Sequence, residues 1–196
     1  MNASTVRGIL AGIVLLSFGL FAQEPGAPVR IDPTIQNYSK LFGQKLSKMF
    51  FLGEIVDKRK NSGSDSVGVT RTGRFEMSTL VCKPLPSAVL QNSLAGMLRE
   101  LGALAEDKKN ADFQMDAELL EFGIEETNKV FSQQIRATVK FRIMIKNPTT
   151  GVLTNQWVIR AEDTRSAVDT TPFAVKVATN AMISGLQNLL ESLSSL

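Results

Sequence analysis

The sequence contains no histidine, and its only cysteine is Cys82. Without histidine, the chain has no Ser-His-Asp or Cys-His catalytic arrangement, no histidine ligand for zinc and no imidazole that titrates near neutral pH. A lone cysteine excludes a disulfide within the chain and a cluster of thiolate metal ligands. We therefore expect no catalytic residues, no metal site and no cofactor, and we predict that the protein is not an enzyme.

An excess of positive charge is also lacking. The 196 residues carry 22 Lys and Arg against 19 Asp and Glu, a formal net charge of +3. Domains that bind nucleic acid usually present a clustered basic face, so the charge predicts no nucleic-acid partner. The hydrophobic fraction of 43% and the charged fraction of 21% are typical of a globular protein with a sizeable core.

The first 22 residues have the pattern of a secretory signal peptide. Arg7 precedes an uncharged, mostly apolar run of 15 positions, residues 8–22, and a polar stretch with prolines follows. A helix that spans a bilayer needs about 20 residues, so cleavage after Ala22 is favoured over an uncleaved anchor. The run does not end in a lipobox cysteine, so no lipid anchor is expected. We predict an exported protein of the periplasm or outer envelope.

The rest of the chain divides into a short leading segment and one domain. Residues 23–45 begin with "QEPGAPVRIDP", whose three prolines predict a linker or N-terminal extension. Residues 46–196 are predicted to form a single α+β domain. Hydrophobic periodicity places its strands and helices at residues 49–56, 67–82, 84–102 (helix), 111–126, 131–146, 152–163 and 171–193 (helix). This order, β-β-α-β-β-β-α, predicts an antiparallel sheet of about four to five strands with both helices packed on one face.

The strand predicted at residues 111–126 has two special features. Its apolar alternation shifts by one position after Leu119, which predicts a β-bulge there. Its polar face carries Asp116 and Glu118, and paired carboxylates can support glycosidase chemistry. However, the next strand presents Arg136, Lys140 and Arg142 on its own polar face, which favours a cross-strand ladder of ion pairs. Cys82, at the end of an earlier predicted strand, is expected to be a buried structural thiol rather than a reactive one, because no histidine is present to act as its base.

The stretch "VDKRKNSGSDSVGVTRTG", residues 56–73, combines four basic residues with three glycines. A phosphate-binding loop has closely spaced glycines and opens directly into a helix. Here the glycines are widely spaced and a strand follows, so the stretch is predicted to connect two strands, with Asp57 bracing Arg59 or Arg71 across its base. The alternative is a loop that contacts a protein or an anionic envelope surface. Its contact residues would be Asp57, Lys58, Arg59, Lys60 and Arg71.

The same stretch resembles a known family. A strand that closes with Asp57 and Arg59, a polar gap, "VGVTRTG" and a helix ending in "LRELG" are similar to small bacterial envelope lipoproteins of the YajG type. The family's Val-Gly and Arg-x-Gly correspond to Val67, Gly68, Arg71 and Gly73. The downstream helix, strands and last helix also resemble auxiliary lipoproteins of lipid-handling ABC transporters, so the resemblance covers about residues 48–195. It implies an envelope location and a non-enzymatic role, but not the lipid anchor, because this chain lacks the lipobox cysteine.

Two functions therefore remain open. The favoured one is a non-catalytic exported module that binds a partner protein, or that assembles or maintains the envelope. The partner is expected to be an envelope protein such as a transporter or outer-membrane component, with a membrane surface as the alternative contact. The second function is a carrier of a lipid or other apolar ligand between the sheet and the helices. Its cavity would be lined by Phe113, Met115, Phe141 and Met182. The sequence does not determine the oligomeric state.

Overall fold

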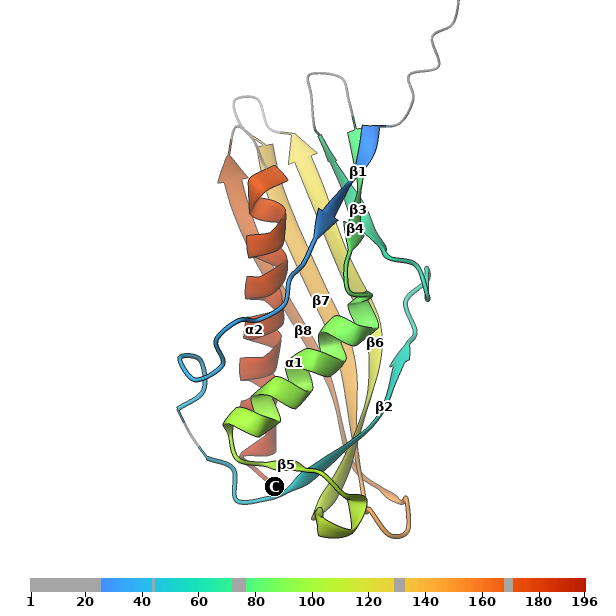
Figure 1. The fold of residues 1–196 in the computed structure, drawn as a ribbon, viewed down its shortest axis with the longest axis vertical. Coiled ribbons are helices and arrows are strands. Elements are labelled where there is room, and N and C mark those ends of the chain that lie inside the picture. The colour runs from blue at the N-terminus through green and yellow to red at the C-terminus, as the bar shows by residue number, and fades with distance from the viewer. Residues whose placement is uncertain (1–25, 44, 72–76, 129–132, 168–170) are drawn as a thin grey trace, which may run out of the picture.

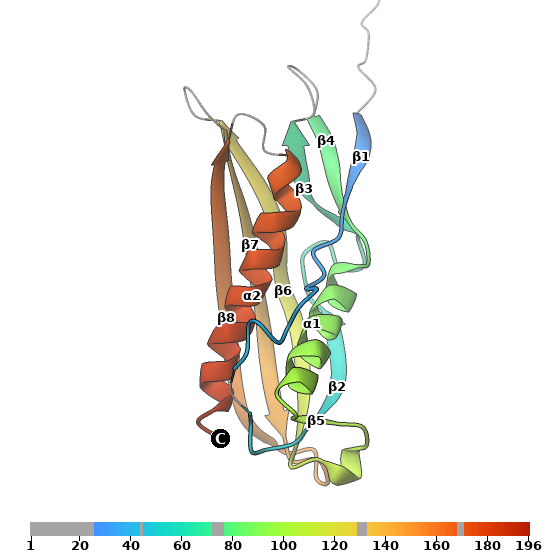
Figure 2. The same ribbon diagram turned by 60° about the vertical axis from the view of Figure 1, so that its left-hand side comes forward.

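One twisted sheet with two helices on one of its faces forms the body of the protein (Figures 1 and 2). The computed structural model describes residues 26–43, 45–71, 77–128, 133–167 and 171–196. Over these residues the sheet has eight strands. The elements in chain order are β1 (Gly26–Ile31), β2 (Phe50–Asp57), β3 (Ser66–Arg71), β4 (Met77–Cys82), α1 (Pro86–Glu100), β5 (Leu104–Ala105), the 3-10 turn η1 (Lys108–Asn110), β6 (Phe113–Asn128), β7 (Gln133–Lys146), β8 (Leu153–Ala167), the 3-10 turn η2 (Thr171–Phe173) and α2 (Ala174–Leu193).

The long strand β6 is the centre of this sheet. Along one edge it pairs antiparallel with β7, which pairs antiparallel with β8. Along its other edge it pairs first with β2 and then, at Gly68 and Ile124, with β3, both in the parallel sense. β3 continues the sheet to β4 and β1, and the short β5 pairs with β2. β2 and β3 therefore follow one another along the same edge of β6.

The predicted antiparallel sheet of four to five strands was wrong, because the sheet is mixed and has eight strands over the described residues. Apolar alternation reveals which residues share a strand face, but it does not reveal the direction of the neighbouring strand. The stretch predicted as one strand, residues 67–82, contains two strands, β3 and β4, which pair antiparallel. The apex between them, residues 72–76, lies outside the described residues.

The predicted linker also contributes to the domain. Within residues 23–45, β1 pairs in parallel with β4. After β1 the chain crosses the outer side of the helices, where Ile35 and Phe42 are buried (Figure 2). Tyr38 stacks on Phe42 with ring centroids 6.4 Å apart. Gly96 of α1 makes room for the Tyr38 ring, since a Cβ there would lie 2.4 Å from that ring.

The core lies between the sheet and the helices. β7 alternates as its sequence predicts, and its buried face meets α2 at Phe141. Gly185 allows α2 to approach closely, because a Cβ at this position would lie 3.1 Å from the Phe141 ring. The predicted bulge in β6 is confirmed by a register shift between Leu119 and Glu121 against β7. None of the helices in the described part of the chain combines the length and hydropathy of a bilayer-crossing segment.

Candidate functional site

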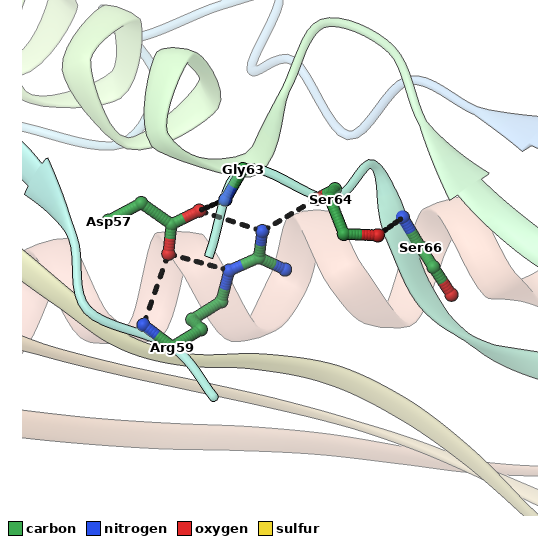
Figure 3. A network of polar contacts seen from close by, with 5 residues as sticks. All are labelled: Asp57, Arg59, Gly63, Ser64 and Ser66. Atoms are coloured by element: carbon green, nitrogen blue, oxygen red, sulfur yellow. Dashed lines mark hydrogen bonds and ion pairs between the residues drawn. The ribbon is translucent and has the colours of Figure 1, made fainter. Parts of the chain in front are cut away.

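The loop after β2 is closed by an ion pair between Asp57 and Arg59 (Figure 3). Arg59 donates from Nε to Asp57 Oδ1 at 2.9 Å and from Nη2 to Asp57 Oδ2 at 2.8 Å. The backbone N–H of Arg59 donates to the same carboxylate, at 3.1 Å from Oδ1. The two side chains are only 6% and 13% exposed, so this is a shielded, two-point pair rather than a surface contact.

The same pair holds the far side of the loop. Arg59 Nη2 also donates to the carbonyl oxygen of Ser64 at 2.7 Å, and the N–H of Gly63 donates to Asp57 Oδ2 at 3.2 Å. Gly63 has φ of 77°, a left-handed conformation that glycine adopts at no steric cost. Burial by itself would raise the pKa of the Asp57 carboxyl. The hydrogen bonds from Arg59 and Gly63 outweigh that effect and keep the pKa below its usual value.

The five residues predicted to form a contact loop separate into two groups. Asp57 and Arg59 point at each other and brace the loop, so of the two braces that the sequence allowed, the structure has the one with Arg59. Lys58 and Lys60 are exposed on either side of the buried Arg59. Arg71 is the last residue of β3, and its backbone pairs with that of Met77. The structure does not describe the Arg71 side chain. Whether these residues contact a partner stays a prediction.

A groove of about 880 Å³ opens beside this loop and was not predicted from the sequence. Its floor is the stretch of β6 from residue 120 to residue 127, which starts at the bulge. Its walls are residues 59–61 of the loop, residues 66–69 at the start of β3, and Lys140 of β7. The groove exists because β2 leaves the edge of β6 at Leu119, while β3 pairs with it at Ile124.

Glycines shape two parts of the groove. At Gly68 the backbone of β3 approaches β6 so closely that a Cβ would lie 2.0 Å from the carbonyl oxygen of Ile124. At Gly123, in the floor, a Cβ would meet nothing within 4 Å. The first glycine therefore permits the strand pairing that ends the groove, and the second leaves its floor open.

The groove carries charges of both signs. Lys60 and Lys140 line it together with Glu121 and Glu125. Arg59 also lines it, and its Nη1 atom has no hydrogen-bond partner among the described residues. Figure 3 shows this nitrogen on the side of the guanidinium that faces away from Asp57. The groove therefore offers a pre-positioned donor, two lysine ammonium groups and the carboxylate of Glu121, whereas Glu125 is ion-paired with Arg136.

The predicted carboxylate ladder is present on the face of the sheet opposite the helices. Arg142 Nη1 lies 2.7 Å from Glu118 Oε2, and Arg136 Nη2 lies 2.7 Å from Glu125 Oε2. The buried Asp116 is paired with Lys146. Hydrogen bonds from Gln114, Lys146 and the N–H of Glu54 outweigh the effect of burial and lower the pKa of Asp116. These carboxylates are neutralised by cations, as in a structural ladder. Within the described residues, no three His, Cys, Asp or Glu side chains form a candidate metal site.

The residues proposed for reactive or apolar sites lie in the interior. Cys82 is fully buried, and burial is the main cause that raises the pKa of its thiol to about 12. Met115, Phe141 and Met182 are fully buried in the hydrophobic core, and Phe113 stacks on Phe50 with centroids 5.7 Å apart. The close contact at Gly185 shows that sheet and helix are tightly packed where Phe141 lies.

The sequence matches no protein-family model and no curated protein, whereas the fold has clear counterparts among solved structures. A Xanthomonas campestris protein of the DUF330 family model aligns with a TM-score of 0.57 at 11% identity, over 85% of this chain and 91% of that chain. A minor lipoprotein of Acinetobacter baumannii aligns with a TM-score of 0.46 at 12% identity, over 77% of this chain and 93% of that chain. The protein thus shares the fold of the first, and bacterial lipoproteins are among its structural neighbours.

Proposed function

We propose that this protein is a non-catalytic, exported module of the bacterial envelope that binds an extended segment of a partner protein. The groove beside the Asp57–Arg59 loop is the binding site, and its composition is the observation that carries the proposal. The groove is lined by one stretch of β6 and by side chains of both charges. Such a surface can bind a polypeptide segment, which carries hydrogen-bond donors and acceptors and side chains of both charges.

The charges of the groove distinguish between partner classes. Nucleic acid and an anionic membrane surface both require a basic patch with few carboxylates. Glu121 lies in the same groove as Lys60 and Lys140, and Glu125 is already ion-paired with Arg136, so a continuous array of phosphates would be repelled by Glu121. A peptide carries donors, acceptors and side chains of both signs, and it can satisfy both sets.

The extended form of the ligand follows from the shape of the floor. The lining includes eight consecutive residues of β6, 120–127, so the groove follows a strand. The free Nη1 of Arg59 is held in place by the Asp57 pair and can donate to a backbone carbonyl or a side-chain carboxylate of the ligand. Exposed Val69 provides apolar contact at the β3 wall.

Location and partner are part of the same proposal. The signal-peptide pattern of residues 1–22 supports export, and the bacterial lipoproteins among the structural neighbours agree with an envelope location. The protein acts in the periplasm or outer envelope. The ligand segment belongs to an envelope protein, a transporter or an outer-membrane component.

Filling the groove tests this function. Gly123→Leu adds a side chain in the open floor, whereas Gly43→Leu adds the same side chain at an exposed position that is also free of neighbours. Each variant is immobilised and used to capture proteins from an envelope extract of the organism that produces the chain. A partner recovered by the wild type and by Gly43→Leu but lost with Gly123→Leu supports the proposal. The same partner recovered with all three, or no specific partner, contradicts it.

A further inference from the structure

The strand β8 forms one edge of the sheet. It is 15 residues long and pairs with β7 along almost its whole length. Within the described residues, no strand pairs with its other side. α2 packs against the face of β8. The edge is separated from the groove by β7, so an interaction there is independent of the function proposed above.

This edge has few of the features that prevent strand addition. Natural edge strands are usually short, interrupted by proline or a bulge, or protected by lysine. β8 contains no proline, glycine or lysine, and from Leu153 to Ile159 it contains no charge. Val158 is 49% exposed and Leu153 is 50% exposed. The charges of the strand are confined to its second half, at Arg160, Glu162, Asp163 and Arg165.

These charges restrict the register for self-pairing. Consider two copies of β8 that pair antiparallel about a two-fold axis perpendicular to the sheet. Directly opposite residues must have their side chains on the same face, so the axis lies midway between the two copies of one residue. An axis at residue 160, 162 or 163 would place two arginines, two glutamates or two aspartates opposite each other. An axis at Thr164 would place Asp163 opposite Arg165, but Asp163 already accepts a hydrogen bond from Asn180 of α2 at 3.0 Å. An axis at Ala161 places each Arg160 opposite Glu162 of the other copy, twice by symmetry.

The neighbouring strand strengthens this choice. Arg160 lies directly opposite Lys140 of β7, a like-charge pair that destabilises a sheet. Arg160 is 57% exposed and Glu162 is 36% exposed, on the face opposite the helices. Arg160 already contacts Glu162 of its own strand, with Nη2 2.8 Å from Oε1. Lys140 has Glu121 of β6 opposite it on its other side, and Glu162 of a second copy would place a carboxylate on the free side of Arg160.

We infer that β8 pairs antiparallel with β8 of a second copy of this chain, about a two-fold axis at Ala161, so that two sheets join into one. Residues 156–166 of each copy form the contact. Val158 then lies opposite Thr164 of the other copy, Trp157 lies opposite Arg165, and both pairs of helices lie on the same face of the joined sheet.

Charge reversal tests both the dimer and its register. The purified full chain is examined by sedimentation equilibrium over a range of concentrations. Arg160→Glu places glutamates opposite each other, and Glu162→Arg places arginines opposite each other. Each single variant is expected to dimerise at least about tenfold more weakly than the wild type. The double variant Arg160→Glu/Glu162→Arg restores opposite charges and is expected to dimerise like the wild type.

Mixing separates this effect from misfolding. In a heterodimer of the Arg160→Glu and Glu162→Arg chains, both contacts bring a glutamate opposite an arginine. The mixture is therefore expected to form heterodimers, although each variant alone is mostly monomeric. A wild-type chain that is monomeric at all concentrations overturns the inference, and so does a dimer that the single variants leave unchanged. A dimer that both singles weaken but that neither mixing nor the double variant restores overturns the register at Ala161.

Discussion

Arg59 donates to the Asp57 carboxylate from two nitrogen atoms, Nε at 2.9 Å and Nη2 at 2.8 Å, while its other terminal nitrogen, Nη1, has no partner in the described structure. One residue thus belongs both to the brace of the loop and to the lining of the groove. The brace fixes the guanidinium plane before any ligand arrives, which reduces the entropy lost on binding. Loop stability and ligand binding are therefore expected to depend on the same pair.

Removing the brace should destabilise the protein. Arg59→Ala leaves the Asp57 carboxylate shielded without its cation, and we expect a loss of about 2 kcal/mol in the free energy of unfolding, between the values for exposed and fully buried pairs. Arg59→Lys keeps the charge but not the two-point geometry, so an intermediate loss is expected. Urea unfolding followed by circular dichroism measures both. A fully stable Arg59→Ala variant would show that the pair does not support the fold.

The brace should also affect stability in acid. The folded state holds the pKa of Asp57 below its unfolded value, so the carboxylate contributes stability at neutral pH. That contribution decreases as the pH falls below about 5 and disappears below the folded pKa. Asp57→Asn should therefore be less stable than the wild type at pH 7, with a difference that narrows toward low pH. Unfolding curves over this range measure the difference, and a gap independent of pH would contradict the assignment.

Gly68 should be sensitive to the smallest added side chain. Gly68→Ala places a methyl group 2.0 Å from the carbonyl oxygen of Ile124, so β3 must move away from β6. We expect a loss of about 2 kcal/mol in the free energy of unfolding. Gly123→Ala is the matched control, since its methyl group meets nothing within 4 Å. Equal stability of the two variants in urea would contradict the close approach of the strands.

Cys82 should be inert while the protein is folded. Its side chain is fully buried, and the raised pKa of about 12 leaves almost no thiolate at pH 8. A thiol-specific reagent should therefore label the native protein very slowly and the urea-unfolded protein rapidly. Fast labelling of the native state would indicate an accessible thiol at this position.

Hydrophobic periodicity in the sequence predicted the strands and the helix that bury one face. The alternation from Ile135 to Ile145 predicted β7, and the phase shift after Leu119 predicted the bulge of β6. The stripe from Val177 to Leu193 predicted α2. In each case one face is buried against a continuous layer, so period and burial coincide.

The parts that were missed depend on residues distant in the sequence. Both β2 and β3 pair in parallel with β6, and nothing in the loop between them indicates that the chain returns to the same edge. The groove arises from that return and from the bulge more than 50 positions later, so neither segment alone predicts it. The spacing Asp57-x-Arg59 allowed the ion pair to be predicted from the sequence, but it did not predict that Arg59 is buried.

Site-specific photo-crosslinking tests the proposed peptide groove most directly. A photoreactive residue replaces the exposed Lys60 at the groove wall in one variant and the exposed Lys109 in η1, outside the groove lining, in another. Both are produced in the native organism and irradiated. We predict one discrete crosslinked product with an envelope protein from position 60, none from position 109, and loss of the product when Gly123→Leu is added. No product from position 60, or a product that Gly123→Leu does not change, would contradict binding in the groove.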